Sequence, residues 1–173
     1  MGLLLAMMKL PTLLAMMALG LTVVSFAETG STEASAQQKI ILSYFHDVLD
    51  GGNIDLVEKI FQPDCAIHFG SSDAHGIAGV RGVVENRKTT YSKLSTEVHD
   101  IFDSGDRVVV RLTHRATGAG ILRSRIGPHD ITGKSVTWDA IVIFQLKNGK
   151  IAEEWVNRDE LGVLLSAGIL KPD

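Results

Sequence analysis

Apolar positions along the chain change from helical spacing in its first half to the alternation of strands in its second half. Residues 40–49 carry apolar side chains at helical spacing, and Gly51-Gly52 ends the run. Ser35 lies three residues before Gln38, which is a capping-box signature in front of this helix. Two further helices are expected: a short one that begins after Asn53 and stops at Pro63, and one over Val80–Leu94.

Segments rich in β-branched and aromatic residues follow, separated by turn residues such as Ser104-Gly105-Asp106 and Lys147-Asn148-Gly149. The expected strands are Cys65–Phe69, Thr96–Asp103, Arg107–Thr117, Ser135–Leu146 and Lys150–Asn157. Two segments are expected as loops, a polar one over Gly70–Gly79 and a mobile one over Gly118–Gly133 at the mouth of the sheet. With a terminal helix over Asp159–Ala167, this order predicts an α+β fold: a curved antiparallel sheet wrapped around three N-terminal helices, with a concave, largely apolar pocket and a short C-terminal helix.

The N-terminal segment has the parts of a secretory signal peptide. Lys9 precedes an uncharged stretch over residues 10–27, which ends in the small-x-small sequence Ser25-Phe26-Ala27. An uncleaved membrane anchor is the alternative, because an apolar stretch of this length is close to the minimum for a span. The cleavage site favours a signal peptide over 1–27, followed by a polar disordered tail over 28–36 and one domain over 37–170. The mature protein is therefore expected in the periplasm or the medium, without membrane contact.

Composition narrows the classes of partner. The formal net charge is −3, so no basic surface for a nucleic acid is expected. The single cysteine, Cys65, excludes an internal disulfide and argues against structural zinc. Asp73 and His75 lie near His68 in the sequence, but their Gly-rich surroundings offer no further ligand, so neither a metal nor another cofactor is expected.

Several motifs in the last third of the chain are more specific than this general pattern. They are Gly133–Trp138, Ile143–Ile151, Glu153-Glu154-Trp155 and Asp159–Gly162, with Pro63-Asp64, His68, Gly105–Arg111, Thr117 and Gly120 upstream. Over roughly residues 38–168 the chain resembles the SnoaL-like family of polyketide-cyclase and ester-cyclase type proteins. The resemblance implies the cone-shaped α+β fold shared with ketosteroid isomerase, scytalone dehydratase and nuclear transport factor two. It also implies cofactor-independent chemistry on a small hydrophobic carbonyl compound.

Valine occupies the positions that correspond to the family's acid–base residues. The family's catalytic Asp corresponds to Val156 and a pocket His to Val142, and valine cannot move a proton. If both valines face the pocket, strand alternation places Trp138 and Phe144 beside Val142, and Glu154 beside Val156. A carboxyl group among such apolar side chains has a raised pKa, which suits a general base.

Glu154 and His68 are therefore the catalytic candidates. Glu154 is either a general base or a purely structural residue, solvated or paired with an arginine such as Arg111. His68 matches a His at the end of the family's first strand and can exchange a proton near pH 7, unless the backbone satisfies it in a half-buried strand. The substrate-binding candidates are Trp138, Val142, Phe144, Val156 and Arg111.

Two functions fit these residues. The first is an exported polyketide-cyclase or ester-cyclase type enzyme that performs acid–base chemistry on a small hydrophobic carbonyl compound. The second is a non-catalytic binding protein for a small apolar ligand, which the valines at 142 and 156 favour. A homodimer through the outer sheet face is also expected, because apolar side chains lie opposite the pocket: Val109, Ile141, Ile143 and Trp155.

Export makes a testable prediction about the N-terminus. The small-x-small site ends at Ala27, so the mature chain should begin at or near Glu28. N-terminal sequencing of the protein recovered from the periplasm or the medium checks this. Recovery of residues 1–20 on the mature protein would contradict it.

Overall fold

The computed structural model describes residues 33–70 and 72–171. The expected signal peptide and residues 28–32 of the expected tail lie outside the described residues. The first helix begins at Ala36, one residue inside that tail. Within the described residues, no helix is both long enough and apolar enough to cross a membrane.

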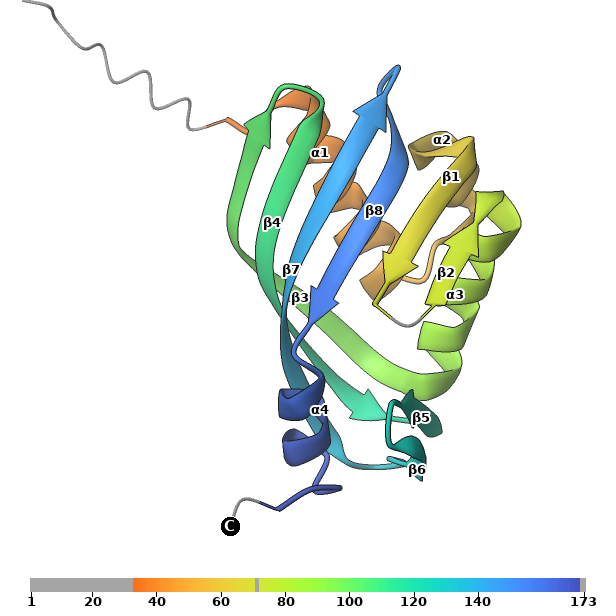
Figure 1. Cartoon of the computed structure of the whole chain (residues 1–173), viewed down its shortest axis with the longest axis vertical. Coiled ribbons are helices and arrows are strands. Elements are labelled where there is room, and N and C mark those ends of the chain that lie inside the picture. The colour runs from red at the N-terminus through yellow and green to blue at the C-terminus, as the bar shows by residue number, and fades with distance from the viewer. Residues whose placement is uncertain (1–32, 71, 172–173) are drawn as a thin grey trace, which may run out of the picture. The chain divides into compact units, whose positions relative to one another are not determined.

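Six strands form one curved sheet in the order β2-β1-β8-β7-β4-β3, which wraps around the helices as Figure 1 shows. Neighbouring strands are antiparallel except for β1 and β8, which are parallel, so the sheet is mixed. The strands are β1 Phe61–Phe69, β2 Ser72–His75, β3 Tyr91–Ser104, β4 Arg107–Gly118, β7 Ser135–Lys147 and β8 Lys150–Arg158. The α+β class and the curved sheet around N-terminal helices are confirmed.

The helices lie on the concave side of the sheet, except for the last, which packs against β7 near the C-terminus (Figure 1). They are α1 Ala36–Ser43, the π-helix η1 Tyr44–Asp50, the 3₁₀ turn η2 Ile54–Leu56, α2 Val57–Ile60, α3 Gly76–Thr90 and α4 Glu160–Ser166. The predicted capping box is present, since the Ser35 side chain accepts from the Gln38 N–H and the Gln38 side chain accepts from the Ser35 N–H.

The π-helix is a local feature with consequences for the interior. Its last turn is widened, because the Gly51 N–H donates to the carbonyl of His46, five residues earlier, at 2.9 Å. A Cβ at position 51 would lie 2.7 Å from the Asp47 carbonyl oxygen, which explains the glycine. The π-helix begins at Tyr44 and ends at Asp50. Both side chains contact polar groups on the sheet.

Several expected boundaries were wrong, including that of β1, which begins at Phe61 instead of Cys65, and two others at β2 and at the end of α3. Residues 72–75, expected in a loop, form β2 and pair with β1 from Ala66↔His75 to Phe69↔Ser72. The third helix ends at Thr90 instead of Leu94, and β3 begins at Tyr91, which pairs with Gly118. Pairing with β4 explains this second difference, because it places the ring of Tyr91 5.0 Å from that of Trp138. Tertiary packing here overrides a helical pattern.

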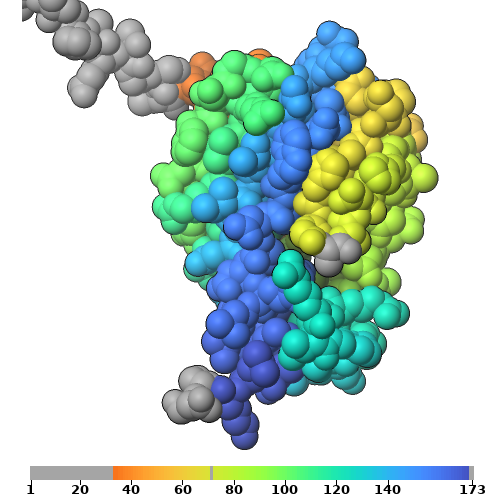
Figure 2. Space-filling model, in the orientation of Figure 1, coloured from red at the N-terminus to blue at the C-terminus, as the bar shows by residue number. Residues whose placement is uncertain are grey.

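The segment expected as a mobile loop at 118–133 instead contains a short hairpin. Its strands are β5 Ile121–Ser124 and β6 Gly127–Asp130, joined by a turn in which Gly127 has φ +112°. Leu122 and Ile131 are buried against the second, smaller apolar cluster, which also contains Trp138. These apolar residues among the glycines are what hold the hairpin in place. In Figure 2 the hairpin lies beside α4, below β1.

Candidate functional site

A cavity of about 450 Å³ opens between the C-terminal ends of β1 and β8, the helix α3 and the β5–β6 hairpin. This volume is within the range of sites for small molecules. Tyr91 and Trp138 form an aromatic part of its wall. The expected apolar character is only partly present, since six charged residues also line the cavity: Arg87, Arg123, Arg125, Arg158, Asp73 and Glu160. The sequence pattern missed them because the hairpin folds over the mouth and α3 turns its last arginine inward.

The structure divides the substrate-binding candidates between the cavity wall and the core. Trp138 and Val156 line the cavity. Val142 and Phe144 share their sheet face, as strand alternation predicts, but they are buried in the main apolar cluster and do not line the cavity. Val142 pairs with Val156, and Phe144 pairs with Glu154. Val142 and Phe144 therefore belong to the apolar layer beneath the cavity wall.

His68 and Arg111 lie on the outer face of the sheet and do not line this cavity. His68 lies between two carboxylates, with its Nδ1 3.3 Å from Asp73 and its Nε2 3.2 Å from Glu153, and its ring stacks on Trp155 at 5.6 Å. The Arg111 Nε donates to Asp100 at 2.6 Å. Arg111 is therefore not the ion-pair partner of Glu154, and His68 is not brought together with Glu154.

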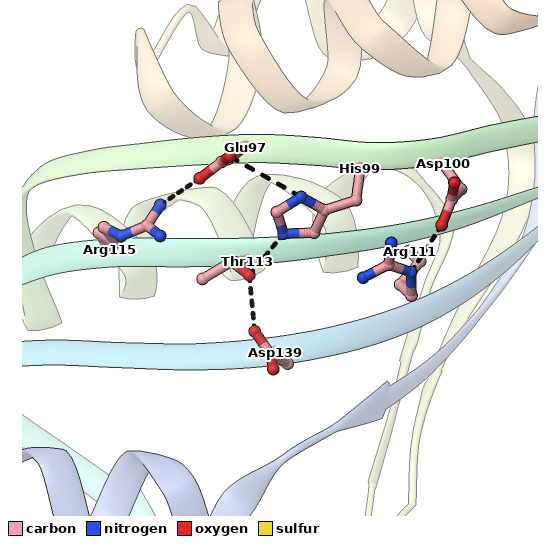
Figure 3. A network of polar contacts seen from close by, with 7 residues as sticks. All are labelled: Glu97, His99, Asp100, Arg111, Thr113, Arg115 and Asp139. Carbon is pink, nitrogen blue, oxygen red and sulfur yellow. Dashed lines mark hydrogen bonds and ion pairs between the residues drawn. The ribbon is translucent and has the colours of Figure 1, made fainter.

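The ion pair of Arg111 and Asp100 lies beside a polar network on β3, β4 and β7, and Figure 3 shows both. The centre of the network is Thr113, whose hydroxyl donates to Asp139 at 2.6 Å and lies 2.8 Å from the Nε2 of His99. Because the one hydroxyl proton goes to Asp139, His99 must donate to the threonine oxygen. The Thr113 hydroxyl is thus fixed by two partners, and the arrangement is a sheet-surface network rather than an activated nucleophile.

Glu154 is the buried acid of the interior. Its side chain is 4% exposed. The Tyr44 hydroxyl donates a hydrogen bond to its carboxylate, while its Oε2 has no hydrogen-bond partner within the described residues. Burial raises the pKa of Glu154 to about 7, although the charge of Arg87 and the bond from Tyr44 pull it down. A carboxyl with this pKa exchanges protons readily near neutral pH.

Two residues that the sequence pattern missed as site residues complete this interior site. Arg87 and Tyr91 line the cavity, and the Arg87 Nη1 and the Tyr91 hydroxyl are both buried without a hydrogen-bond partner in the described chain. Burial raises the pKa of Tyr91, so its hydroxyl stays protonated and can donate. A signal for Arg87 exists in the sequence: it lies three residues after Val84 and three before Thr90, both of which are buried on α3.

His114 is a further buried polar residue that the pattern missed. The Thr96 N–H and hydroxyl donate to Asp50 at 2.8 and 2.7 Å, and the Thr96 oxygen lies 2.9 Å from the Nδ1 of His114. Since the threonine proton is used on Asp50, the imidazole Nδ1 carries the donated proton. Burial lowers the pKa of His114 to about 2, helped by the charges of Arg87 and Arg158. His114 is thus neutral, with its ring 4.9 Å from Trp138.

Nothing in the described residues groups three or more His, Cys, Asp or Glu side chains in a way that could hold a metal ion. The cavity wall provides a guanidinium and a tyrosine hydroxyl, and the interior beyond it contains a carboxyl whose pKa is about 7. These groups can accept a proton and donate hydrogen bonds to the oxygen atoms of a ligand.

Several solved structures share this fold. TsrD from Streptomyces laurentii aligns with a TM-score of 0.69 and 22% identity, over 80% of this chain and 98% of that one. A proposed polyketide cyclase from Acidithiobacillus ferrooxidans aligns with a TM-score of 0.67 and 19% identity, over 80% and 98%. An epoxide hydrolase of the LEH-like type from M. tuberculosis aligns with a TM-score of 0.62 and 12% identity, over 78% and 90%. At these identities the likeness concerns the fold.

Sequence comparison identifies the family more directly. No curated protein matches the chain in sequence. The sequence model of one family, the SnoaL-like polyketide cyclases, matches residues 39–166, which is most of the chain and nearly the whole described domain. The match includes α3 and β8, which carry Arg87 and Glu154. The chain belongs to the SnoaL-like polyketide cyclase family.

Proposed function

We propose that this protein is an exported, cofactor-independent enzyme of the cyclase type, which moves a proton on a small carbonyl compound. Glu154 is its general base and acid. The observation that carries the proposal is a set of three buried polar atoms without partners in the described residues: the Arg87 Nη1 and the Tyr91 hydroxyl, whose residues line the cavity, and the Glu154 Oε2, whose residue lies deeper than the cavity wall. Leaving such atoms unpaired costs about 1–3 kcal/mol each, a cost that a bound ligand with matching polar groups would remove.

The roles follow from the chemistry of each group. With its pKa raised to about 7, Glu154 is partly ionised at neutral pH, so it can take a proton from a carbon beside a carbonyl group and return it. The negative charge that then develops on the carbonyl oxygen needs hydrogen-bond donors, and the Tyr91 hydroxyl and the Arg87 Nη1 can supply them. Tyr44 holds the carboxylate in position by its hydrogen bond.

The alternative function, a binding protein without catalysis, is favoured by one observation. Glu154 itself does not line the cavity, because it lies deeper than Val156, two residues earlier on the same face of β8. If ligands stop at Val156, the carboxyl is out of reach and the protein only binds. The experiments on Glu154 below separate the two functions.

A pH-dependent stability measurement tests the buried state of Glu154. Since its pKa in the folded protein, about 7, exceeds the ordinary value of 4.5, the folded state holds a proton that the unfolded state releases between these values. The contribution of protonated Glu154 to the stability of the fold is fully present below pH 4.5 and is lost as the pH rises through 7. Glu154→Gln should raise the free energy of unfolding relative to wild type by about 3 kcal/mol at pH 8 and hardly at pH 4.

Urea unfolding at pH 4, 6 and 8 gives these differences. Glu153→Gln is the matched control, because Glu153 is the neighbouring residue on the opposite face and its side chain is 42% exposed. It should show no such rise with pH. A difference between Glu154→Gln and wild type that is constant from pH 4 to pH 8 would show that the pKa of Glu154 is the same in the folded and unfolded states, and would contradict the raised value.

The same variant tests catalysis. Exchange of the acidic carbon-bound protons of 2-acetylcyclopentanone into D₂O, followed by NMR, requires only a positioned base. Wild type should accelerate this exchange, and Glu154→Gln should slow the protein-catalysed rate by about 10²–10⁴-fold, the usual contribution of a general base. Glu153→Gln should exchange like wild type. If the probe binds but exchanges equally fast with wild type and Glu154→Gln, the binding-protein function is correct.

We also propose that the protein is a homodimer through the outer face of the sheet. Register places apolar side chains in one row across four strands, at Phe102, Val109, Ile143 and Trp155, with the exposed Ile141 beside them. Ile143→Glu places a charge in the middle of this row and should convert a dimer to a monomer, as measured by light scattering at micromolar concentration. Leu161→Glu, at an exposed position on α4, should leave the mass unchanged. A monomeric wild type would contradict the proposal.

A further inference from the structure

We propose that the compound held in this cavity carries a carboxylate, which binds to Arg87 and Tyr91. This inference rests on the proposed function only for the choice of cavity, and it concerns recognition of the ligand rather than its reaction. It differs from the expectation of a purely apolar ligand. The reasons lie in the charges of the cavity wall and in the two donors that have no partner.

Positive charge exceeds negative charge on the wall. Four arginines line the cavity together with two acids, although the chain as a whole has a net charge of −3. Both acids already have cationic or polar partners. Asp73 lies 3.3 Å from the Nδ1 of His68, and Glu160 lies 3.3 Å from the Nε of Arg125 and 4.0 Å from Arg158. Glu160 is thus the ion-pair partner of two arginines, and it also accepts a hydrogen bond from the backbone N–H of Arg125 at 2.7 Å.

Arg87 has no ion pair among the described residues, although it lines the cavity. Its charge lowers the pKa values of Tyr44, Tyr91, His114 and Glu154. Its Nη1 is buried and unpartnered. An arginine is a rigid, permanently charged donor whose geometry matches a carboxylate, so a carboxylate is the natural partner for this group.

The second donor and the surrounding rings select the kind of anion. The Tyr91 hydroxyl, also buried without a partner, gives a carboxylate a second hydrogen bond. Tyr91 and Trp138, with ring centroids 5.0 Å apart, give the rest of the ligand an apolar surface. The partly ionised Glu154 nearby disfavours a second negative charge on the ligand. These features favour a monocarboxylate with a flat apolar body over a phosphate ester.

The two tryptophans of the chain allow a direct test, because Trp138 lines the cavity and Trp155 lies on the outer face. In a Trp155→Phe background the remaining fluorescence reports on the cavity wall. Phenylacetate and phenylacetamide are matched probes that differ in charge. At pH 7, phenylacetate should quench Trp138 with a Kd about 10–100-fold lower than that of the amide, as expected for a charge-assisted bond to a buried donor.

Arginine variants show which residue causes the preference for phenylacetate over phenylacetamide. Arg87→Gln should remove the preference for the carboxylate, while Arg111→Gln, on the outer face, should keep it. Arg158→Gln should weaken the preference by a smaller factor, since Arg158 is already close to Glu160, and it serves as a second variant if Arg87→Gln does not fold. Equal affinities of wild type for the two probes, or a preference unaffected by either arginine variant, would overturn the inference. Tighter binding of phenyl phosphate than of phenylacetate would overturn the choice of a carboxylate.

The test is independent of the proposed reaction. Measured in Glu154→Gln, the preference for phenylacetate over phenylacetamide should persist, because Arg87 and Tyr91 are unchanged. Loss of proton exchange in that variant with the preference intact supports both proposals. Unchanged exchange with the preference intact removes the catalytic role of Glu154 and leaves a carboxylate-binding protein. An absent preference in a protein whose exchange still depends on Glu154 removes only the inference about the carboxylate.

Discussion

The interior of this domain depends on one carboxyl group that lies out of water with a single hydrogen bond. Glu154 is held by Tyr44, and Arg87 supplies the nearby positive charge. Burying an acid in this way destabilises a fold unless its environment compensates, and here the compensation is incomplete, because burial prevails and raises the pKa to about 7. Arg87 and Tyr44 reduce the free-energy cost of burying the charged carboxyl. Proteins retain such strained arrangements mainly where function needs them.

The fold brings the two compensating groups to Glu154 from two separate elements. The π-helix η1 provides Tyr44, the last turn of α3 provides Arg87, and the curved sheet provides Glu154 itself. The same π-helix ends at Asp50, which fixes Thr96 and, through it, the neutral His114 beside Trp138. A regular α-helix over these residues would rotate Asp50 relative to Tyr44, because the two are six residues apart. The π-helix therefore positions both Tyr44 against Glu154 and Asp50 against Thr96.

The sequence predicted those features of the fold and the site that depend on residues close together in the chain. Alternation along β7 and β8 correctly placed Trp138, Phe144, Glu154 and Val156 on the inner face, because a pleated strand fixes side-chain direction locally. His68 follows the same rule: its neighbours Ile67 and Phe69 point inward, so it points outward. The family resemblance correctly indicated the fold and the family.

What could not be predicted depends on contacts between distant segments. The Asp50–Thr96–His114 chain joins residues 46 and 18 positions apart. The arginines of the cavity wall come from α3, the hairpin segment and the end of β8, and only the folded hairpin brings them together. The hairpin itself was missed because its glycines and proline are typical of a loop, while the burial of Leu122 and Ile131 is decided by the cluster around Trp138.

The position of Arg87 between the cavity and Glu154 couples ligand binding to protonation. In the empty site the guanidinium lowers the pKa of Glu154. An anion bound to Arg87 would neutralise that effect and move the carboxyl pKa upward, so each binding event near neutral pH would take up a fraction of a proton from the buffer. The heat of binding would then vary with the ionisation enthalpy of the buffer. An anionic ligand would in this way increase the basicity of the group beside it.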